Sequence, residues 1–201
     1  WRQSSDAILR IGKMFGPHAV RPYIGDALAF VRAAADAVEG SWALSAVFED
    51  DLLLGGCPQQ VNAAIADALA QLPPTADLLY LEFCFEDCRQ LQVSPQRPRL
   101  ARAVKPACSG AIVLTLKGAR RVVELFSPVY HRVDVMLPDL VEQGNLEAYL
   151  ALPGLLFQDA HWGSTAPRSS SVRDAQEAGG QHAILAPTCT ARPRWTHRYS
   201  T

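Results

Sequence analysis

The chain has 201 residues, of which 49% are hydrophobic and 19% are charged. This composition is typical of a globular domain and unlike that of a disordered chain. The formal net charge of -1 argues against electrostatic binding of nucleic acid or of an anionic membrane surface. No apolar run approaches the ~20 residues that a membrane-spanning helix needs. We therefore expect no nucleic-acid partner and no membrane span in this chain.

The first expected elements are two helices and a strand. Apolar spacing predicts a short helix over residues 4–14. An alanine-rich stretch with Asp26 as a fair N-cap and Gly40 as its stop predicts a helix over residues 25–38. The run 42–48 is almost wholly apolar and ends in three acids, which is typical of a strand buried on both faces of a sheet.

The alternation of helices and strands continues along the chain. In order, we expect a helix over 61–72, a strand over 77–83, a proline-containing loop over 89–106, a strand over 111–116, a helix over 117–126, a helix over 134–143 and short strands within 146–156. This order indicates an α/β layered domain with a mainly parallel mixed sheet flanked by helices. Near residue 166 the composition turns to Pro, Ser, Arg and Gly, so we expect a domain over residues 1–165 and a loosely ordered tail over 166–201.

The five cysteines leave at least one thiol unpaired within the chain. Cys84 and Cys88 are four residues apart, and Cys108 precedes a small-residue turn. A disulfide between one of the first two and Cys108 would suit an oxidising compartment, and plain buried thiols are the alternative. A zinc site is less favoured, because the spacing is not that of a usual zinc knuckle and no histidine is close in sequence.

Three acids, Glu49, Asp50 and Asp51, follow the predicted strand. The carboxyl ends of strands in open α/β sheets face the crevice where ligands bind. In an extended chain Glu49 and Asp51 share one face and Asp50 faces the other way. Two carboxylates repel each other unless a cation lies between them, and oxygen ligands suit Mn²⁺ or Mg²⁺. The pattern predicts a divalent-metal site at Glu49 and Asp51, with a solvated acidic turn as the alternative.

The segment around these acids, Val47–Leu52, resembles the signature of glycosyltransferase family 25, which includes procollagen and lipooligosaccharide galactosyltransferases. Further pieces of that family's pattern follow in the same order. They are Ala76–Glu82, similar to Trp-Asp-x-x-Tyr-Leu-Gly; Ser109–Ala119, similar to a small-residue turn, strand and helix; Arg132–Pro138, similar to Pro-Val-Asp-Glu-x-Leu-Pro; and Pro153–Gln158, similar to Pro-x-Leu-x-x-Gln. The resemblance covers about residues 20–165.

The resemblance implies a GT-A-like fold and a metal-dependent, inverting glycosyltransferase. Such an enzyme uses Mn²⁺, or Mg²⁺, to transfer a hexose, galactose or glucose, from a UDP-hexose to a hydroxyl of a glycan, a lipooligosaccharide or a protein. It would work in the lumen of the endoplasmic reticulum or Golgi in a eukaryote and in the cytoplasm in a bacterium. The alternative is a non-catalytic binding domain on the same fold, which two departures favour: Gly25-Asp26 in place of Ser-His, and Val135 in place of Glu.

The resemblance also suggests roles beyond the metal ligands. Asp50 would bind a sugar or ribose hydroxyl, and Ser109 and Gly110 would form a close-approach turn near the donor, with a simple turn as the alternative. Gln158 would contact the metal or the diphosphate, with a polar loop exit as the alternative. Asp134 would be the catalytic base that takes the proton of the acceptor hydroxyl, and the alternative is an N-cap of the following helix.

Overall fold

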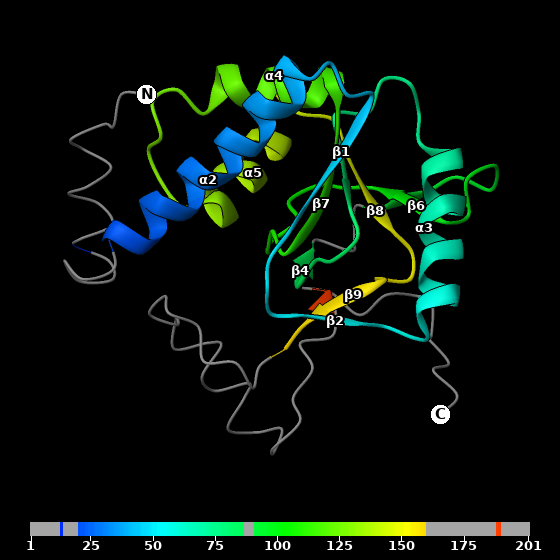
Figure 1. Ribbon diagram of the computed structural model, residues 1–201. Helices are drawn as coiled ribbons and strands as arrows, with labels where there is room; N and C mark the ends of the chain where they lie inside the picture. The colour runs from blue at the N-terminus through cyan, green and yellow to red at the C-terminus, as the bar shows by residue number, and fades with distance from the viewer. Residues whose placement is uncertain (1–12, 14–19, 87–90, 160–187, 190–201) are drawn as a thin grey trace.

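The computed structural model describes residues 13, 20–86, 91–159 and 188–189, which fold as an α/β structure around a six-stranded mixed sheet (Figure 1). Its longer helices are α2 (Val20–Glu39), α3 (Pro58–Gln71), α4 (Leu116–Leu125) and α5 (Val133–Glu142). Its strands are β1 (Leu44–Phe48), β2 (Leu52–Leu54), β3 (Leu78–Tyr80), β4 (Phe85–Glu86), β5 (Gln92–Val93), β6 (Leu100–Arg102), β7 (Ala111–Thr115), β8 (Ala148–Ala151), β9 (Leu156–Gln158) and β10 (Thr188–Cys189).

The six-stranded sheet has the order β1-β7-β3-β8-β6-β5. Only β3 and β8 pair in parallel within it, and every other neighbouring pair is antiparallel. The expectation of an α/β domain with a mixed sheet is confirmed, but the expectation that this sheet is mainly parallel is wrong. The physical reason is that β3 and β7 are joined without a crossover helix, so the chain returns beside β3 in the opposite direction.

The strand directions decide which chain segments meet at one edge of the sheet. Because β1 and β3 both lie antiparallel to β7, they run in the same direction. The carboxyl ends of β1 and β3 therefore lie at the same edge as the amino end of β7. In sequence, these three positions are separated by tens of residues. The fold thus brings the segments around residues 49, 82 and 109 together.

One face of the sheet is covered by α2, α4 and α5 (Figure 1). The buried positions of α2 recur at helical spacing and include Tyr23, Ala27, Phe30, Ala34 and Ala37, among others. Phe126, the C-cap residue of α4, is fully buried, and the centroid of its ring lies 5.9 Å from that of Phe30. Thr115 caps α4, because its side-chain oxygen accepts a hydrogen bond of 2.9 Å from the backbone N–H of Gly118.

The other face is covered by α3, which begins at Pro58, where a missing backbone N–H costs nothing. This cover does not extend to β1, which is the end strand of the sheet. None of its five residues is buried, and Leu44 and Phe48 are 45% and 53% exposed. The strand predicted over 42–48 is confirmed, whereas the expectation that it is buried on both faces is wrong.

The other predicted helices and loops can be compared with the structure segment by segment. The helices predicted within 25–38, 61–72, 117–126 and 134–143 are confirmed, with ends that shift by up to a few residues except that α2 begins at Val20. The predicted loop 89–106 contains β5 and β6. The helix predicted over 4–14 and the tail 166–201 lie almost wholly outside the described residues. Across the part of the chain that is described, no helix has the length and apolar character required to cross a membrane.

Candidate functional site

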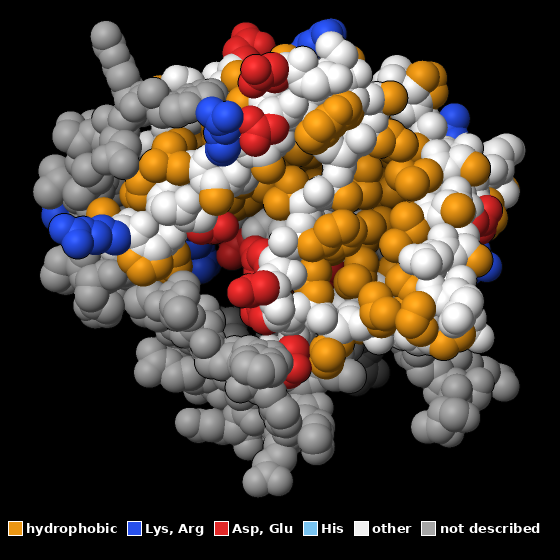
Figure 2. Space-filling model, viewed as in Figure 1, with side chains coloured by type: hydrophobic (Ala, Val, Ile, Leu, Met, Phe, Trp, Pro, Cys, Tyr) orange, Lys and Arg blue, Asp and Glu red, His pale blue; other side chains and the backbone are white. Residues whose placement is uncertain are grey.

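Acidic side chains gather where the carboxyl ends of β1 and β3 meet the amino end of β7. Figure 2 shows Asp and Glu side chains around a hollow between α2 and the turn that joins β1 to β2. The sheet contributes Glu49 and Glu82, which follow β1 and β3, and the turn contributes Asp51. The helices contribute Asp26 from α2 and Asp134 from the first turn of α5. We call these five side chains the carboxylate cluster.

Ser109 joins two members of the carboxylate cluster. Its Oγ lies 2.6 Å from Asp134 Oδ1 and 3.3 Å from Glu49 Oε1. The backbone holds this arrangement, because the N–H of Glu49 donates a hydrogen bond of 2.7 Å to the carbonyl oxygen of Gly110. A hydroxyl has one proton, so Ser109 donates to the nearer oxygen, that of Asp134. The second contact is then satisfied when a protonated Glu49 donates to Ser109 Oγ.

The surroundings of Glu49 raise its pKa, against a smaller lowering effect of the Ser109 hydroxyl. Desolvation, followed by the negative charges of Asp134, Asp26 and Asp51, raises the pKa of Glu49 from 4.5 to about 8. Glu49 is therefore largely protonated at neutral pH. Asp26 is exposed, yet partial desolvation and the charge of Asp134 raise its pKa to about 6, against smaller opposing effects of the Val133 backbone and Arg132.

Glu82 is the most deeply buried acid of the carboxylate cluster, at 1% exposure. Burial, and after it the charge of Glu49, raise its pKa to about 8. Its Oε2 accepts a hydrogen bond of 3.1 Å from the backbone N–H of Gly110. A Cβ at position 110 would lie 3.0 Å from that same oxygen and 3.0 Å from Leu52 Cδ2, so the glycine permits this close approach. The turn at Ser109-Gly110 thus approaches the Glu82 carboxylate closely, and its expected approach to a donor stays a prediction.

Asp51 is held in one orientation by the strand β9. The side-chain amide of Gln158 donates a hydrogen bond of 2.8 Å to Asp51 Oδ2, and the backbone N–H of Asp159 donates one of 2.6 Å to the Asp51 carbonyl. Within the described residues, the other carboxylate oxygen, Asp51 Oδ1, is buried and has no hydrogen-bond partner. A buried oxygen of this kind is costly, and a cation would satisfy it.

The carboxylate cluster therefore fits a divalent cation by its chemistry, although not as a closed cage. Its oxygens are hard ligands, and burial, followed by the charges of neighbouring carboxylates, raises the pKa values of Glu49 and Glu82, so a cation would stabilise their ionised forms. Among the described residues, the compact group with three ligand atoms within 4.8 Å of one another is Glu82, Cys84 and Cys108. Neither Glu49 nor Asp51 belongs to such a group, so a metal held by these two would take its other ligands from elsewhere.

The structure brings some of the site residues predicted from the sequence into contact with one another, but not all of them. Glu49, Ser109, Gly110 and Asp134 are in direct contact through the hydrogen bonds above, and Gln158 contacts Asp51. Asp50 is exposed in the turn between β1 and β2, and its proposed contact with a sugar hydroxyl stays a prediction. The alternative of Asp134 as an N-cap is wrong, because Arg132 has that position.

Sequence reasoning missed two members of the carboxylate cluster. Asp26 was expected to be an N-cap, but α2 begins at Val20 and places Asp26 in the interior of the helix. Glu82 was read as part of an apolar strand. The signal that could have found it is its position, because an acid that ends an apolar run is either buried or directed to a site. A comparison of the chain with models of protein families finds no match, and neither does a comparison with curated proteins.

Proposed function

We propose that the chain is a metal-dependent glycosyltransferase that transfers a hexose from a UDP-sugar to an acceptor hydroxyl. The observation that carries the proposal is the carboxylate cluster at the carboxyl ends of β1 and β3, with the unpaired oxygen of Asp51 within it. The resemblance of the segment Val47–Leu52 to family 25 gives the cluster a specific purpose. The GT-A-like fold belongs to the same proposal, and the mixed sheet flanked by helices supports it.

Asp51 and Glu49 would hold the metal. Gln158 engages one oxygen of Asp51 and leaves the other available, so it acts as a positioning residue for the ligand. A divalent metal bound here, Mn²⁺ or Mg²⁺, would offset the negative charge that develops on the departing nucleoside diphosphate. Because only two carboxylates are offered, the diphosphate oxygens would complete the ligand set.

Asp134 would take the proton of the acceptor hydroxyl. It lies in the first turn of α5, where the partial positive charge of the helix terminus stabilises a carboxylate. Its Oδ1 accepts the hydrogen bond of 2.6 Å from Ser109, which fixes its orientation. The Ser109 hydroxyl thus marks the place where an acceptor hydroxyl would approach, and a carboxylate at hydrogen-bonding distance is the geometry that general base catalysis needs.

Thermal unfolding with Mn²⁺ and a UDP-hexose tests the binding part of the proposal. Ligand at about 100 times its Kd stabilises the folded state by about 2.7 kcal/mol, which raises the Tm by roughly 5–10 °C for a domain of this size. Asp51→Asn should abolish the shift. Asp67→Asn is the matched control, because Asp67 lies on α3 in an exposed ion pair with Arg99, and this variant should shift like the wild type. A wild-type Tm that does not move contradicts the proposal.

Release of UDP from the donor separates an enzyme from a non-catalytic binding domain. Asp134→Asn should keep the shift in Tm and lose at least about 100-fold in the rate of UDP release, which is the lower range for a general base. Should the wild type show the shift in Tm but no manganese-dependent release of UDP, the chain is the binding domain instead.

A further inference from the structure

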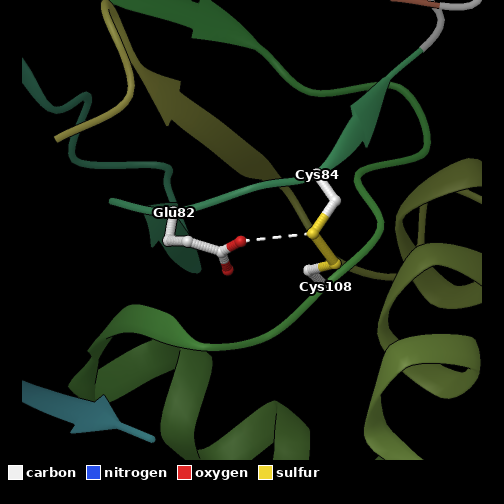
Figure 3. Close-up of side chains that lie close together, drawn as sticks. All are labelled: Glu82, Cys84 and Cys108. Atoms are coloured by element: carbon white, nitrogen blue, oxygen red, sulfur yellow. Dashed lines mark hydrogen bonds between the residues drawn. A yellow bond between two sulfur atoms is a disulfide. The ribbon is translucent and has the colours of Figure 1, made fainter. Parts of the chain in front are cut away.

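A second group of potential ligands shares Glu82 with the carboxylate cluster and adds two cysteines. Glu82 follows β3, Cys84 comes two residues later, and Cys108 belongs to the loop before β7. Figure 3 shows the three side chains directed toward one another. Cys84 and Cys108 form a disulfide, and Glu82 and Cys84 are 1% and 2% exposed. The sequence predicts a disulfide of either Cys84 or Cys88 with Cys108, or buried free thiols, and the structure has the pair Cys84–Cys108.

The geometry points to a site for a thiophilic divalent cation, of the Zn²⁺ class, at Glu82, Cys84 and Cys108 in the reduced protein. In the oxidised protein the same two sulfurs are closed by the disulfide. Reduction by a dithiol transfers two electrons and two protons to the disulfide, gives two thiols, and converts the dithiol to its own disulfide. Binding of Zn²⁺ then releases the two thiol protons to solvent, because thiolates are the ligands.

The residue types match the ligand set of zinc, and the distance between Glu82 and Cys84 is close to that in a zinc site. On a tetrahedral zinc, a thiolate sulfur and a carboxylate oxygen lie about 3.5 Å apart, and two thiolates about 3.8 Å apart. Cys84 Sγ lies 3.3 Å from Glu82 Oε1, and the ligand atoms of all three residues lie within 4.8 Å of one another. The sulfurs have to separate on reduction, which side-chain rotation allows with the Cα atoms 5.5 Å apart. Water would fill the fourth position.

The carboxylate of Glu82 is already oriented as a ligand would need to be. Its Oε2 accepts the hydrogen bond from the Gly110 N–H, while its Oε1 faces Cys84. A backbone donor on the second oxygen is the kind of outer partner that fixes metal-binding carboxylates. Burial of Glu82 and Cys84 excludes bulk water, which favours a bound cation of opposite charge over separate thiolates and carboxylate.

This inference does not depend on the proposed function, although Glu82 belongs to the carboxylate cluster as well as to this site. Glu49 and Asp51 offer oxygen alone, which suits Mn²⁺ or Mg²⁺, whereas two sulfurs select a softer cation. Both closures, disulfide or zinc, tether Cys108, which directly precedes the Ser109-Gly110 turn. Either link at Cys108 would therefore keep this turn beside the carboxylate cluster, the disulfide in an oxidising compartment and the zinc in a reducing one.

The zinc content of the full chain tests the inference. The protein is equilibrated with Zn²⁺, with or without a water-soluble trialkylphosphine, which reduces the disulfide and leaves as the phosphine oxide with the oxygen of water. After removal of free metal, we expect one zinc per chain in the reduced protein and none in the oxidised protein. Cys84→Ser should lose the zinc, and Cys57→Ser is the matched control that should keep it, because Cys57 is an exposed free thiol.

Two further measurements keep the inference falsifiable if Cys84→Ser does not fold. Co²⁺ in the reduced wild type should give the intense thiolate-to-metal absorption of a tetrahedral sulfur site, and Cys108→Ser should weaken it. Glu82→Gln should weaken zinc affinity by at least the roughly tenfold that loss of an outer-shell partner costs. A reduced wild type without zinc, equal zinc in the oxidised protein, or zinc retained by both cysteine variants would overturn the assignment.

Discussion

The two faces of the six-stranded sheet differ in how completely they are covered. On one face, α2, α4 and α5 leave Phe126, Met136 and Leu137 with no exposed surface. On the other face, α3 is the one helix among the described residues that covers the sheet, and its buried residues are Val61 and Ala68. Figure 2 shows a broad hydrophobic surface between β1 and α3. The exposed large hydrophobic side chains in and next to β1 and β2 are Trp42, Leu44, Phe48, Leu53 and Leu54.

The difference is greatest at β1, the end strand. The N–H of Leu116 donates to the carbonyl of Ala43, and that of Glu49 donates to the carbonyl of Gly110. In an antiparallel pair every second residue is hydrogen-bonded to the neighbouring strand, and these two bonds show that the odd-numbered residues of β1 are the ones bonded to β7. The backbone N–H and C=O groups of Leu44, Ala46 and Phe48 therefore point away from β7. Among the described residues no strand pairs with this side of β1, and an apolar edge of this kind is a site for further strand pairing. We therefore expect the face packed against α2, α4 and α5, called the helix-covered face below, to contribute most of the free energy of unfolding. The edge formed by β1 leaves apolar surface exposed.

The largest expected effect comes from a large-to-small substitution on the helix-covered face. Phe126→Ala removes a fully buried ring that packs beside Phe30, and the cavity adds to the lost burial. We expect the free energy of unfolding to fall by about 3–5 kcal/mol. Equilibrium denaturation by urea measures it. A loss below about 1 kcal/mol would mean that this face is not the stabilising one.

A second effect is expected from pH, through the carboxylate cluster at the edge of the helix-covered face. The pKa values of Glu49 and Glu82 are about 8 in the folded chain, against 4.5 for an ordinary glutamate. Between these values the folded state keeps protons that the unfolded state releases. The free energy of unfolding therefore falls as pH rises from about 5 to 8, and it levels off above 8, where both states are ionised.

The Tm measured between pH 5 and pH 9 shows this dependence. Glu82→Gln should make the decline shallower, because one of the two protons is no longer taken up. Glu124→Gln, at an exposed position on α4, is the control and should leave the slope unchanged. A Tm that rises with pH over this interval would contradict the raised pKa values of Glu49 and Glu82 in the folded chain.

The sequence predicted the local pattern of the site better than its surroundings. The strand before Glu49 and the turn at Ser109-Gly110 are fixed by neighbouring residues, so their positions could be predicted. Glu82 could not be assigned to the site, because its contact with Gly110 depends on β7 lying beside β3. The exposure of β1 was missed for a similar reason, since an apolar run does not show what lies next to it in the sheet.

The strand β6 is a second element that the local sequence did not predict. The prolines at 95 and 98 favoured a loop, because proline interrupts strand pairing. The strand begins directly after them, at Leu100, and pairs with β8 far along the chain. Pairing between distant segments is set by the whole fold and not by the residues of one segment. For the same reason, the direction of β7 could not be taken from the alternation of elements.

The smallest expected effect is the same substitution on the other face. Phe48→Ala removes a phenylalanine ring that is 53% exposed, where Phe126 is 0% exposed. We expect a change of about 0.5 kcal/mol or less in the free energy of unfolding, several-fold below that for Phe126→Ala. Urea denaturation of the two variants, side by side, measures the ratio. A cost for Phe48→Ala comparable to that for Phe126→Ala would mean that Phe48 is buried in solution, and sedimentation velocity would then show whether self-association at the β1 edge covers it.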